Sequence, residues 1–596
     1  MTREGQNEGV RETFAWRAKR FRHRGVTWGT VVCAEWNGVP GAGTGVLGCG
    51  GPLGSLRVVP VVADSSVRAR SGGHAPKRCG ACAKWRTMRV SGGLPCSPVH
   101  GAAVRWEAGI VLALSMGSER SRHGAARTGC GGAAREDGTM TTTPDFSPEL
   151  IRRYDRRLPR YTSYPTAPHF SMDVDEERLA ALVGDRGAAD RPLSLYVHVP
   201  FCRSLCWYCG CATVISKSEE QRRSYMRLLR REIEHKAGLV DTEREVIQVH
   251  FGGGTPSDLP PDVLREIGEV LHSTFRVAPH AEEAIEIDPR DLTREHVRAM
   301  REAGFRRASI GVQDTQPRVQ AAINRVQPFA LVEQAFRWLR EEGFESVNVD
   351  LIYGLPAQTE ASIRETIQEV LTLSPSRLAV YGYAHVPGMR PAQRLLERYG
   401  IPGSEERLAM LGVIVGTLTD AGYEHIGMDH YARPDDELSV ALREGTLQRN
   451  FQGYSTRGGA DILGFGMSAI SSIGRAYVAA PRTLDDWAQA VERDAFPAER
   501  WMVLSEDDLM RRRIIESIMC VGRPALDEVS EEFGVDPFET FARELEGLGD
   551  LEEDGLIERT PGGFRVTPRG RFLVRHVAAR FDAWLEDDGR RYSAAI

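Results

Sequence analysis

The stretch YVHVPFCRSLCWYCGCATVI, residues 196–215, gathers four of the chain's 11 cysteines directly behind a run that alternates like a buried strand. Cys202, Cys206 and Cys209 follow one another at intervals of four and three positions, and Cys211 comes two positions later. Three thiols on one tight loop are a typical set of metal ligands. Two cysteines with a single residue between them rarely reach neighbouring ligand positions, so we expect Cys211 to lie outside the set.

The number of ligands indicates the kind of metal. Structural zinc takes four tetrahedral ligands, usually as two separated pairs. Neither a second cysteine pair nor an HxxxH pattern lies near this loop. A [4Fe–4S] cluster has four irons, so three cysteines leave one iron open to a ligand from a small molecule. An amino and a carboxylate group can chelate that iron and receive an electron there, and we therefore favour an iron–sulfur cluster.

The composition of the 596 residues, 41% hydrophobic and 27% charged, is that of a soluble protein of about two to four domains. The longest apolar run, residues 108–114, is far too short to span a bilayer. The first residues contain no apolar segment with a cleavage site. We therefore expect a cytoplasmic protein, in whose reducing surroundings clustered cysteines indicate metal or redox chemistry rather than disulfides.

Residues 1–139 differ from the rest in charge and composition. They carry 20 Lys and Arg against 9 Asp and Glu, whereas the remainder carries 56 against 73. Their six cysteines share no spacing, and the lone CxxC from Cys79 to Cys82 is a poor zinc ribbon. The basic charge could serve a nucleic-acid arm. We expect instead that the segment is disordered or an upstream extension, with Met140 as the better start, and we assign it no function.

Strand-like and helix-like segments alternate from residue 191 to about residue 400. Apolar or β-branched runs predict strands at residues 193–199, 246–251, 284–287, 308–312, 346–352 and 377–383. Periodic segments predict helices at residues 221–237, 261–275, 294–303, 330–342 and 360–373. Six such repeats imply a parallel sheet with right-handed crossovers in an α/β fold. Six units rather than eight predict a partial, open, TIM-like (β/α)6 barrel.

Polar residues cluster where these strands end, which in parallel barrels is the end that carries the chemistry. They are His198, His250, Glu286, Asp288, Gln313, Asp350 and His385. His198 could pack on the cluster or be a core histidine with satisfied hydrogen bonds, and we slightly favour the first.

The segments that flank the barrel have other patterns. Residues 140–190 predict an N-terminal arm, residues 401–500 a barrel-covering region that is rich in loops at 427–474, and residues 501–596 a mainly helical domain. Within the arm a short helix is expected at residues 148–156. The last domain resembles a winged helix, because several helices precede a small hairpin with a Gly-Gly turn. Its helices are rich in acids, so we favour a packing or lid role over DNA binding.

The spacing Cys-x3-Cys-x-aromatic-Cys, with Tyr208 in the aromatic place, resembles the signature of the radical S-adenosylmethionine (SAM) superfamily. The resemblance implies that the amino-acid end of SAM chelates the open iron, and that an electron passed to the sulfonium yields a 5′-deoxyadenosyl radical. A second motif supports it, since GGGTP at residues 252–256 follows the second predicted strand, as in this superfamily. Glycines let the backbone approach a ligand closely, and a barrel with lids shields a radical from water.

From about residue 147 to its end the chain resembles the oxygen-independent coproporphyrinogen III oxidases of haem biosynthesis. Besides the cysteine stretch, the resemblance rests on PRYTSYPT (159–166), IEIDPR (285–290), GVQD (311–314), VDLIYGLP (349–356), GYAHVP (382–387), GMDHYARPDDEL (427–438) and RNFQGYSTRGGADILGFGMSAIS (449–471). The pair Cys209-Gly-Cys211 and the tyrosine-bearing arm are marks of this family. The related haem chaperones resemble the same barrel, but they usually have phenylalanine in place of Cys211 and lack the arm.

The resemblance implies a set of cofactor-binding positions, with Cys202, Cys206 and Cys209 as cluster ligands and two SAM molecules bound. The first SAM would contact Tyr196, Gly253, Glu286 and Ile470. The second SAM would contact Tyr208, Gly254, Thr255, Gln313, Arg325, Asp350 and Ala384. A carboxylate at Glu286 suits two ribose hydroxyls, because it accepts two hydrogen bonds. Glu286 and Asp350 could instead form ordinary ion pairs, but their common place at strand ends favours a site.

The reaction implied is an oxidative decarboxylation. The radical removes hydrogen from the β-carbon of a propionate, carbon dioxide leaves, and an electron acceptor takes the remaining electron. Two propionates of coproporphyrinogen III thereby become the vinyls of protoporphyrinogen IX. Tyr196 and Glu286 are counted as catalytic positions, Phe451 and Gln452 would close the site, and Cys211 would act in proton or electron transfer.

The substrate carries four carboxylates, so cations are expected near it. The candidates are the arm residues Arg152, Arg153, Arg156, Arg157 and Arg160, whose guanidinium forks fit carboxylates, although a solvated helix face explains them equally well. The resemblance further implies a reductant protein such as a flavodoxin or ferredoxin, a monomer, and neither a nucleic-acid nor a membrane partner. Two rival hypotheses are a haem-binding chaperone without decarboxylase activity and a zinc or nucleic-acid module on the C-terminal domain.

Overall fold

The computed structural model describes residues 148–184, 190–585 and 592, together with the backbone of eight short strands before residue 115. Residues 1–130 and 131–596 form two compact units. The strands of the first unit are β1 (Ala15–Lys19), β2 (Arg22–His23), β3 (Val26–Thr27), β4 (Val31–Glu35), β5 (Gly45–Gly48), β6 (Arg57–Val58), β7 (Ala102–Arg105) and β8 (Val111–Leu114). Apart from these strands, the expectation for residues 1–139 lies outside the described residues and stays a prediction.

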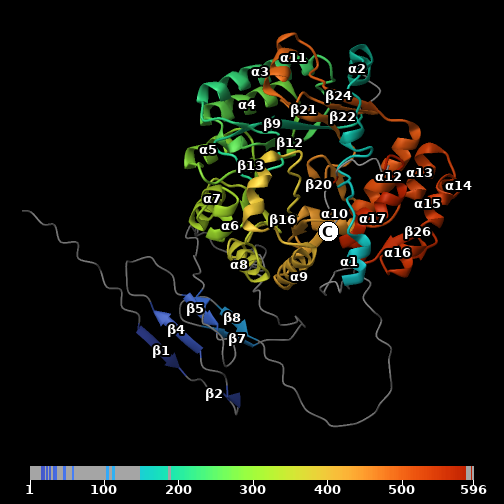
Figure 1. The fold of residues 1–596 in the computed structure, drawn as a ribbon. Helices are drawn as coiled ribbons and strands as arrows, with labels where there is room; N and C mark the ends of the chain where they lie inside the picture. Colours follow the sequence, from blue (N-terminus) through green and yellow to red (C-terminus); the bar gives the residue numbers. More distant parts are fainter. Residues whose placement is uncertain are drawn as a thin grey trace, which may run out of the picture. The chain divides into compact units, whose positions relative to one another are not determined.

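Six parallel strands form the centre of the second unit, each at the place that the sequence predicts (Figure 1). They are β9 (Leu193–Val199), β12 (Val246–Gly253), β13 (Val277–Ile287), β14 (Arg307–Gln313), β15 (Ser346–Tyr353) and β16 (Arg377–Gly382). The helices between them are α3 (Glu219–Ala237), α4 (Pro261–Thr274), α5 (Arg294–Glu302), α6 (Pro317–Ala322), α7 (Phe329–Glu341) and α8 (Glu360–Leu371). Each strand pairs with the next in chain order, so the prediction of a partial parallel barrel is confirmed.

The strands have one apolar and one polar face, because successive side chains of a strand point to opposite sides. In β9, Leu195 and Val197 are fully buried in the same core as the apolar residues of the helices. Ser194 and Tyr196 lie on the other face, where the Ser194 hydroxyl donates to Oε1 of Gln248 on β12 at 2.8 Å. The inside of the barrel is therefore lined by polar side chains.

The sheet continues beyond the six predicted strands into the region predicted to be rich in loops. β21 (Asp461–Phe465) pairs in parallel with β9, and β22 (Ile470–Ile473), β23 (Ala476–Ala479) and β24 (Arg500–Val503) follow antiparallel. Beyond β16 lie β18 (His430–Ala432) and β17 (Glu424–Gly427), also antiparallel. This region also contains α9 (Ser404–Asp420), α10 (Glu437–Glu444), α11 (Leu484–Glu492) and the hairpin of β19 (Gln448–Asn450) and β20 (Gly453–Ser455). These strands are too short for a period of two to stand out, so the expectation of loops there is corrected.

Charged residues occupy the amino ends of the parallel strands, around a cavity of about 470 Å³. Glu437 at the start of α10 accepts hydrogen bonds from Arg307 at 2.6 Å and from Arg377 at 2.8 Å. Asp436 binds Arg377 through both of its oxygens at 2.8 Å. Burial by itself would raise the pKa of Glu282, but Arg307 and Arg377 hold it at about 2. This ion network joins α10 to the amino ends of the barrel strands.

The C-terminal domain consists of short helices followed by a hairpin, as predicted. Its elements are α12 (Glu506–Val521), α13 (Leu526–Phe533), α14 (Pro537–Thr540), α15 (Ala542–Glu546), α16 (Gly549–Glu553), β25 (Ile557–Thr560), β26 (Gly563–Val566), η6 (Gly570–Leu573), α17 (Val574–Ala578) and η7 (Ala579–Phe581). The arm contributes α1 (Pro148–Tyr154), η2 (Ala167–His169) and α2 (Glu176–Val183). Leu150, Tyr154 and Tyr164 of the arm share one core with the C-terminal domain, and α1 lies beside α16 and α17 in Figure 1. The start and the end of residues 148–585 thus pack together.

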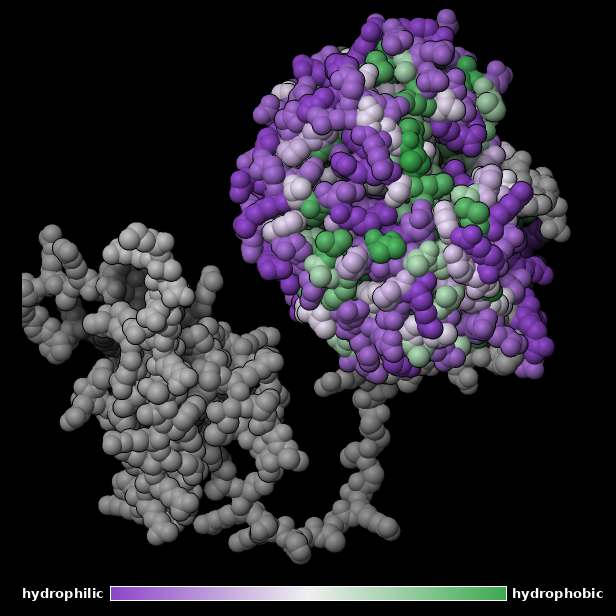
Figure 2. Space-filling model, turned by 60° about the vertical axis from the view of Figure 1, so that its left-hand side comes forward, coloured by the Kyte–Doolittle hydropathy of each residue, from purple (hydrophilic) through white to green (hydrophobic). Residues whose placement is uncertain are grey.

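The surface of this unit is largely hydrophilic, and hydrophobic residues gather in a band on the face that Figure 2 shows. Within the described parts of the chain, no helix is both long and apolar enough to cross a membrane.

Candidate active site

The cysteine loop begins where β9 ends. Its base is closed by two short parallel strands, β10 (Phe201–Cys202) and β11 (Val214–Ile215), with hydrogen bonds from Val214 N to Pro200 O at 2.8 Å and from Ser216 N to Cys202 O at 3.0 Å. Inside the loop a turn joins Cys209 N to Cys206 O at 3.1 Å. The loop therefore has a defined backbone. Cys206 is buried, Cys202 and Cys209 are half-buried, and Cys211 is exposed.

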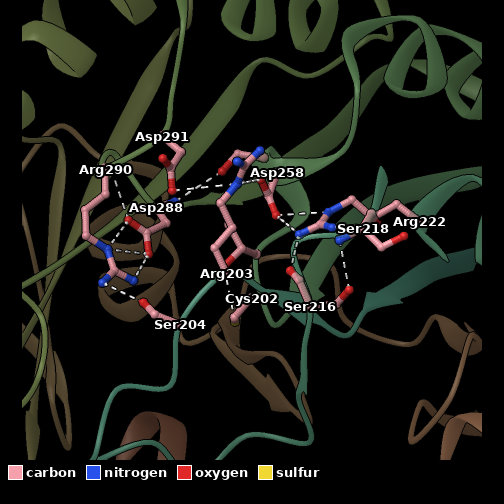
Figure 3. A network of polar contacts seen from close by, with 12 residues as sticks. Cys202, Arg203, Ser204, Ser216, Ser218, Arg222, Asp258, Asp288, Arg290 and Asp291 are labelled. Carbon is pink, nitrogen blue, oxygen red and sulfur yellow. Dashed lines mark hydrogen bonds and ion pairs between the residues drawn. The ribbon is translucent and has the colours of Figure 1, made fainter. Parts of the chain in front are cut away.

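A buried carboxylate holds this loop to its neighbours (Figure 3). Asp258 ends η4 (Pro256–Asp258), directly after the glycine motif, and accepts hydrogen bonds from Nε of Arg203 at 2.5 Å and Nε of Arg222 at 3.0 Å. Arg222 also donates to the carbonyl oxygens of Ser216 and Ser218, both at 2.8 Å. Asp258 thus fixes both ends of the cysteine loop. The sequence analysis missed it, although its position two residues after GGGTP was a usable signal.

Two arginines point at the sulfur of Cys206. Nη2 of Arg290 lies 3.8 Å and Nη1 of Arg325 3.6 Å from Cys206 Sγ. Asp288 binds both, at 2.6 Å and 2.9 Å (Figure 3 shows the Arg290 pair). Burial opposes ionisation of Asp288, but Arg325 and Arg290 hold its pKa at about 2. A thiolate of Cys206 would therefore meet two fixed N–H donors. Arg325 was predicted, whereas Arg290 was not.

The glycines of GGGTP are required by close packing at the end of β12. A Cβ atom on Gly253, whose φ is +114°, would lie 2.5 Å from the His198 ring. On Gly254 it would lie 2.5 Å from the backbone of Pro200, at the start of the cysteine loop. The Gly253 N–H donates to Oε2 of Glu286 at 3.1 Å, and Thr255 Oγ1 lies 3.3 Å from Cys202 Sγ. Glu286 is therefore brought to the glycine motif, and Thr255 of that motif to Cys202, while their contacts with SAM stay a prediction.

Tyr196 and His198 belong to one hydrogen-bonded chain beneath the cysteine loop. The Tyr196 hydroxyl lies 3.0 Å from Nδ1 of His198, and Nε2 of His198 lies 3.0 Å from the carbonyl oxygen of Ala212. His198 is 5% exposed, and burial lowers its pKa. Both ring nitrogens thus have partners. His198 is a satisfied core histidine that supports the loop, which favours the second of the two interpretations over the one that we had preferred.

Asp350 lies on the inner face of β15 among neutral hydrogen-bond donors. Ser309 donates to its Oδ2 at 2.6 Å and Asn348 to its Oδ1 at 2.9 Å. Burial raises the pKa of Asp350 to about 6. Glu286 has Nε2 of His250 at 3.6 Å. Among the described residues neither carboxylate forms an ion pair with Lys or Arg, so the ordinary strand-end ion pair is not what the structure contains.

Two of the positions predicted for a second SAM, Tyr208 and Ala384, are joined by a glutamine that was not predicted. The side-chain amide of Gln393 donates to the carbonyl oxygens of Tyr208 at 3.0 Å and Ala384 at 3.2 Å, and so joins the two. Gln313 and Arg325 flank Gly311, where an added Cβ would lie 2.7 Å from the first side chain and 3.2 Å from the second. Gln393 was not predicted, because nothing in its local sequence indicates that it bridges two segments.

Of the three predicted positions after residue 450, Ile470 lies on a strand that extends the sheet, whereas Phe451 and Gln452 form the turn of the separate β19–β20 hairpin. Ile470 begins β22 and lies beside β21, where Gly464 is in register with Tyr196 and an added Cβ would lie 2.9 Å from Ile470 O. The Phe451 ring packs edge-on against Tyr477, 5.6 Å between centroids. Both polar atoms of the Gln452 side chain are buried without a hydrogen-bond partner among the described residues. Ile470 is thus brought near Tyr196, whereas Phe451 packs with Tyr477.

The arm arginines do not gather at the site as a group. Arg152 lies 3.8 Å from Glu149 and Arg153 2.9 Å from Asp554, both with exposed side chains. Arg157 donates to Tyr592 O at 3.5 Å. Of the five candidates, Arg160 alone has an ion pair with a residue of the barrel-covering region, Asp429, among the described residues. Of the arm arginines, Arg160 is therefore the one that remains a candidate for binding the substrate carboxylates.

The donor set fits a cluster better than a single ion. No three His, Cys, Asp or Glu side chains in the described residues stand close enough together to hold one metal ion. Thiolates of a cubane cluster bind different irons and stand farther apart than the ligands of one ion. Hydrogen bonds from Cys211 lower the pKa of Cys209 to about 6, whereas burial raises that of Cys202 to about 11. Three cysteines on a rigid loop thus suit a [4Fe–4S] cluster.

Comparisons with known proteins agree with this geometry. Residues 196–370 match the family model of the radical SAM superfamily, and residues 504–573 match the HemN C-terminal domain. The oxygen-independent coproporphyrinogen III oxidase of Synechocystis is 40% identical over 466 residues, which make up 77% of this chain and all of the relative. The enzyme of the same name from Escherichia coli K12 is 40% identical over 75% of this chain and 97% of the relative. The solved structure of HemN from Escherichia coli, described as a radical SAM enzyme, covers 74% of this chain with a TM-score of 0.71.

The partial barrel and its three-cysteine loop therefore define a radical SAM enzyme, with a [4Fe–4S] cluster and SAM as cofactors. The chain belongs to the oxygen-independent coproporphyrinogen III oxidases. The hairpin domain matches the C-terminal domain of this family.

Proposed function

We propose that this chain converts two propionate side chains of coproporphyrinogen III to the vinyls of protoporphyrinogen IX, without oxygen, in porphyrin biosynthesis. The observation that carries the proposal is the rigid three-cysteine loop at the carboxyl end of the barrel, in a chain that aligns with coproporphyrinogen oxidases over their whole length. Cys202, Cys206 and Cys209 would hold the cluster. When bound, the cluster and SAM supply an electron and a 5′-deoxyadenosyl radical.

The protein's own residues would bind and orient SAM at the strand ends. Tyr196, Gly253, Glu286 and Ile470 would contact the first molecule; their support is the bond from Gly253 N to Glu286 and the register of β21 with β9. Tyr208, Gly254, Thr255, Gln313, Arg325, Asp350 and Ala384 would contact the second. Glu286 keeps acceptor capacity for hydroxyl groups, because only one of its oxygens accepts a protein N–H among the described hydrogen bonds.

The remaining predicted residues would act on the substrate side. Gln452 has a buried amide whose hydrogen-bonding capacity is unused in the described structure, so it can serve a substrate group without first breaking a protein contact. Phe451 would exclude water from one edge of the site, since its ring packs on Tyr477. Cys211, exposed and hydrogen-bonded through its N–H to Cys209 Sγ at 3.4 Å, would transfer a proton or an electron.

The proposal also covers the partner proteins, the oligomeric state and the cellular location. The reaction needs an electron for each SAM that is cleaved, which a small protein such as a flavodoxin or ferredoxin would deliver to the half-exposed cysteine loop. We propose that the chain acts as a monomer in the cytoplasm.

The test is an anaerobic assay of the full chain after cluster reconstitution, with SAM, a reductant and coproporphyrinogen III. We expect protoporphyrinogen together with 5′-deoxyadenosine. Formation of 5′-deoxyadenosine without any vinyl product would refute the decarboxylase activity, and stoichiometric haem binding in the same preparation would favour a chaperone. Zinc in place of iron in protein purified without air would refute the cluster itself.

A further inference from the structure

A group of buried and half-buried arginines lies where the arm, β19 and the C-terminal domain meet. Arg160 of the arm is paired with Asp429, and its guanidinium lies 5.8 Å from the centroid of the Tyr381 ring. Arg449 on β19 is 5% exposed and donates from Nη2 to the carbonyl oxygen of Arg160 at 3.4 Å. Arg575 on α17 donates from Nε to the carbonyl oxygen of Pro159 at 2.9 Å.

These guanidinium groups are close enough to affect one another. Burial, together with the charges of Arg160 and Arg449, lowers the pKa of Arg575 to about 9. Burial also lowers the pKa of the neighbouring Arg571, which donates to the carbonyl oxygen of Ile426 at 2.8 Å. Several positive charges thus share a buried region in which Asp429 is the carboxylate that neutralises Arg160. Such an excess of buried positive charge is costly unless an anion joins it.

Arg449 is the member with unused hydrogen-bonding capacity. Its Nε and Nη1 are both buried and have no partner among the described residues. No described carboxylate pairs with it, and its guanidinium lies 4.6 Å from the Tyr454 ring centroid, in a cation–π contact. Nε–H and Nη1–H belong to different edges of the guanidinium, so each can donate its own charge-assisted hydrogen bond to an anion. The buried amide of Gln452, three residues along the same hairpin, also lacks a partner.

This arginine group adjoins the strand ends that carry the proposed SAM contacts. In the register of the sheet, Asp350 of β15 pairs with Ala379 of β16, and Ala379 pairs with His430 of β18, the residue after Asp429. Adjacent strands are about 4.8 Å apart, so His430, directly after Asp429, lies roughly 10 Å from Asp350. The Tyr381 ring, edge-on to His430 at 5.8 Å, lies between the two regions. A porphyrinogen is large enough to reach from one to the other.

We propose that Arg449 binds a propionate carboxylate of the tetracarboxylate substrate through its unpartnered Nη1, with Arg160 beside it. The proposal rests on the proposed function and deepens it. It names a substrate-binding cation, Arg449, to which the sequence analysis assigned no role. Asp429 would keep Arg160 ionised and in place before the substrate enters.

The test compares the wild-type chain with Arg449→Gln and Arg449→Lys, all with reconstituted cluster and SAM. The probes are coproporphyrin III, a stable tetra-acid, and its tetramethyl ester, whose binding is followed by fluorescence. Arg340→Gln is the matched control. This arginine lies in the last turn of α7 and donates to the backbone of Ser374. We expect Arg449→Gln to weaken binding of the acid by about tenfold or more, as for a lost charge-assisted hydrogen bond. Binding of the ester should not change.

Three further readouts make the outcome decisive. The KM for coproporphyrinogen III should rise by a similar factor, whereas the spectroscopic change of the cluster on adding SAM should stay as in the wild type. Arg449→Lys keeps the positive charge but loses the guanidinium group, so its affinity for the acid should lie between those of the wild type and Arg449→Gln. If Arg449→Gln does not fold, Arg449→Lys takes its place in the comparison. Equal affinity of wild type and variants for the acid, or equal losses for acid and ester, would overturn the proposal. A wild-type chain that makes no protoporphyrinogen would refute the proposed function instead.

Discussion

Among single residues, the four clustered cysteines differ most in what surrounds them. Cys206 is buried under Arg290 and Arg325, whereas Cys211 is exposed and reaches the set through its backbone N–H to Cys209. Spacing alone indicates that Cys211 lies outside the ligand set, and this division stays a prediction.

We predict that Cys206→Ser abolishes the brown absorbance of the reconstituted cluster and lowers the iron content to near zero. Cys211→Ser should keep the absorbance and the iron, while turnover falls by about 100-fold, the lower range of what a proton-transfer group contributes. Absorbance, iron analysis and the product assay measure the three quantities. Loss of iron in the Cys211 variant would show that the ligand set is wrong.

A second prediction at this scale concerns Asp350, whose pKa burial raises to about 6. The folded state then holds the Asp350 proton more tightly than the unfolded chain does, so its contribution to stability is present at low pH. That contribution is lost as the pH rises from about 4 to about 6. The carboxylate of Glu286 acts in the same direction, whereas the charge of His250 opposes it.

We therefore expect the stability of the wild type relative to Asp350→Asn to fall by about 2 kcal/mol over this pH range. Urea unfolding at several pH values, in the absence of SAM, measures the difference. A difference that is constant between pH 4 and 7 would contradict the assignment. Glu341→Gln, at an exposed site on α7, supplies the baseline for pH effects that are unrelated to the barrel interior.

At the scale of elements, the position of β21 depends on a buried ion pair in α3. Nζ of Lys236 lies 2.7 Å from Oε1 of Glu232 and donates to the carbonyl oxygen of Gly464 on β21 at 2.6 Å. Oε2 of Glu232 accepts the N–H groups of Gly466 at 2.8 Å and Trp487 Nε1 at 3.0 Å. A helix of the predicted barrel thereby holds a strand that joins it from more than 200 residues later.

Lys236→Met should lower the free energy of unfolding by about 3 to 5 kcal/mol, because it leaves Glu232 as an uncompensated buried charge. Arg230→Met on the same helix is the matched control, since its pair with Glu234 is exposed and should be worth about 0 to 1 kcal/mol. Denaturant unfolding compares the two. Similar small losses in both variants would show that the buried pair does not hold β21.

At the scale of the whole molecule, residues 148–585 form one unit whose arm and C-terminal domain share a core. The Tyr154 hydroxyl donates to Asp554 at 2.6 Å, across 400 positions of sequence. The relatives are matched over 97 to 100% of their length by 74 to 77% of this chain, about the share that residues 140–596 make up.

A chain that begins at Met140 should therefore fold and keep full activity, within about twofold of the whole chain. Thermal unfolding and the product assay, run side by side on both forms, check this. Failure of the shorter chain to fold would give residues 1–139 a role that we have not assigned to them.

The sequence by itself determined the class of the protein. The periods of two and 3.6 residues are local properties, so the six parallel strands and their helices could be placed to within a few residues at most boundaries. The cysteine spacing and the glycine motif are equally local, and they located the loop and its support. The sequence did not predict the first seven residues of β13 or the short strands after residue 427, because too few residues alternate there.

Only the tertiary structure decided which distant residues meet. β21 pairs with β9, Asp258 and Gln393 fix a loop that precedes them by more than 45 residues, and Arg449 loses its solvent without gaining a counterion. Burial and partnership depend on segments that converge in space, and no local pattern records that convergence. For this reason the motifs could indicate the chemistry, whereas the groups that hold the cysteine loop, and the arginine that we propose for the substrate, had to be found in the folded chain.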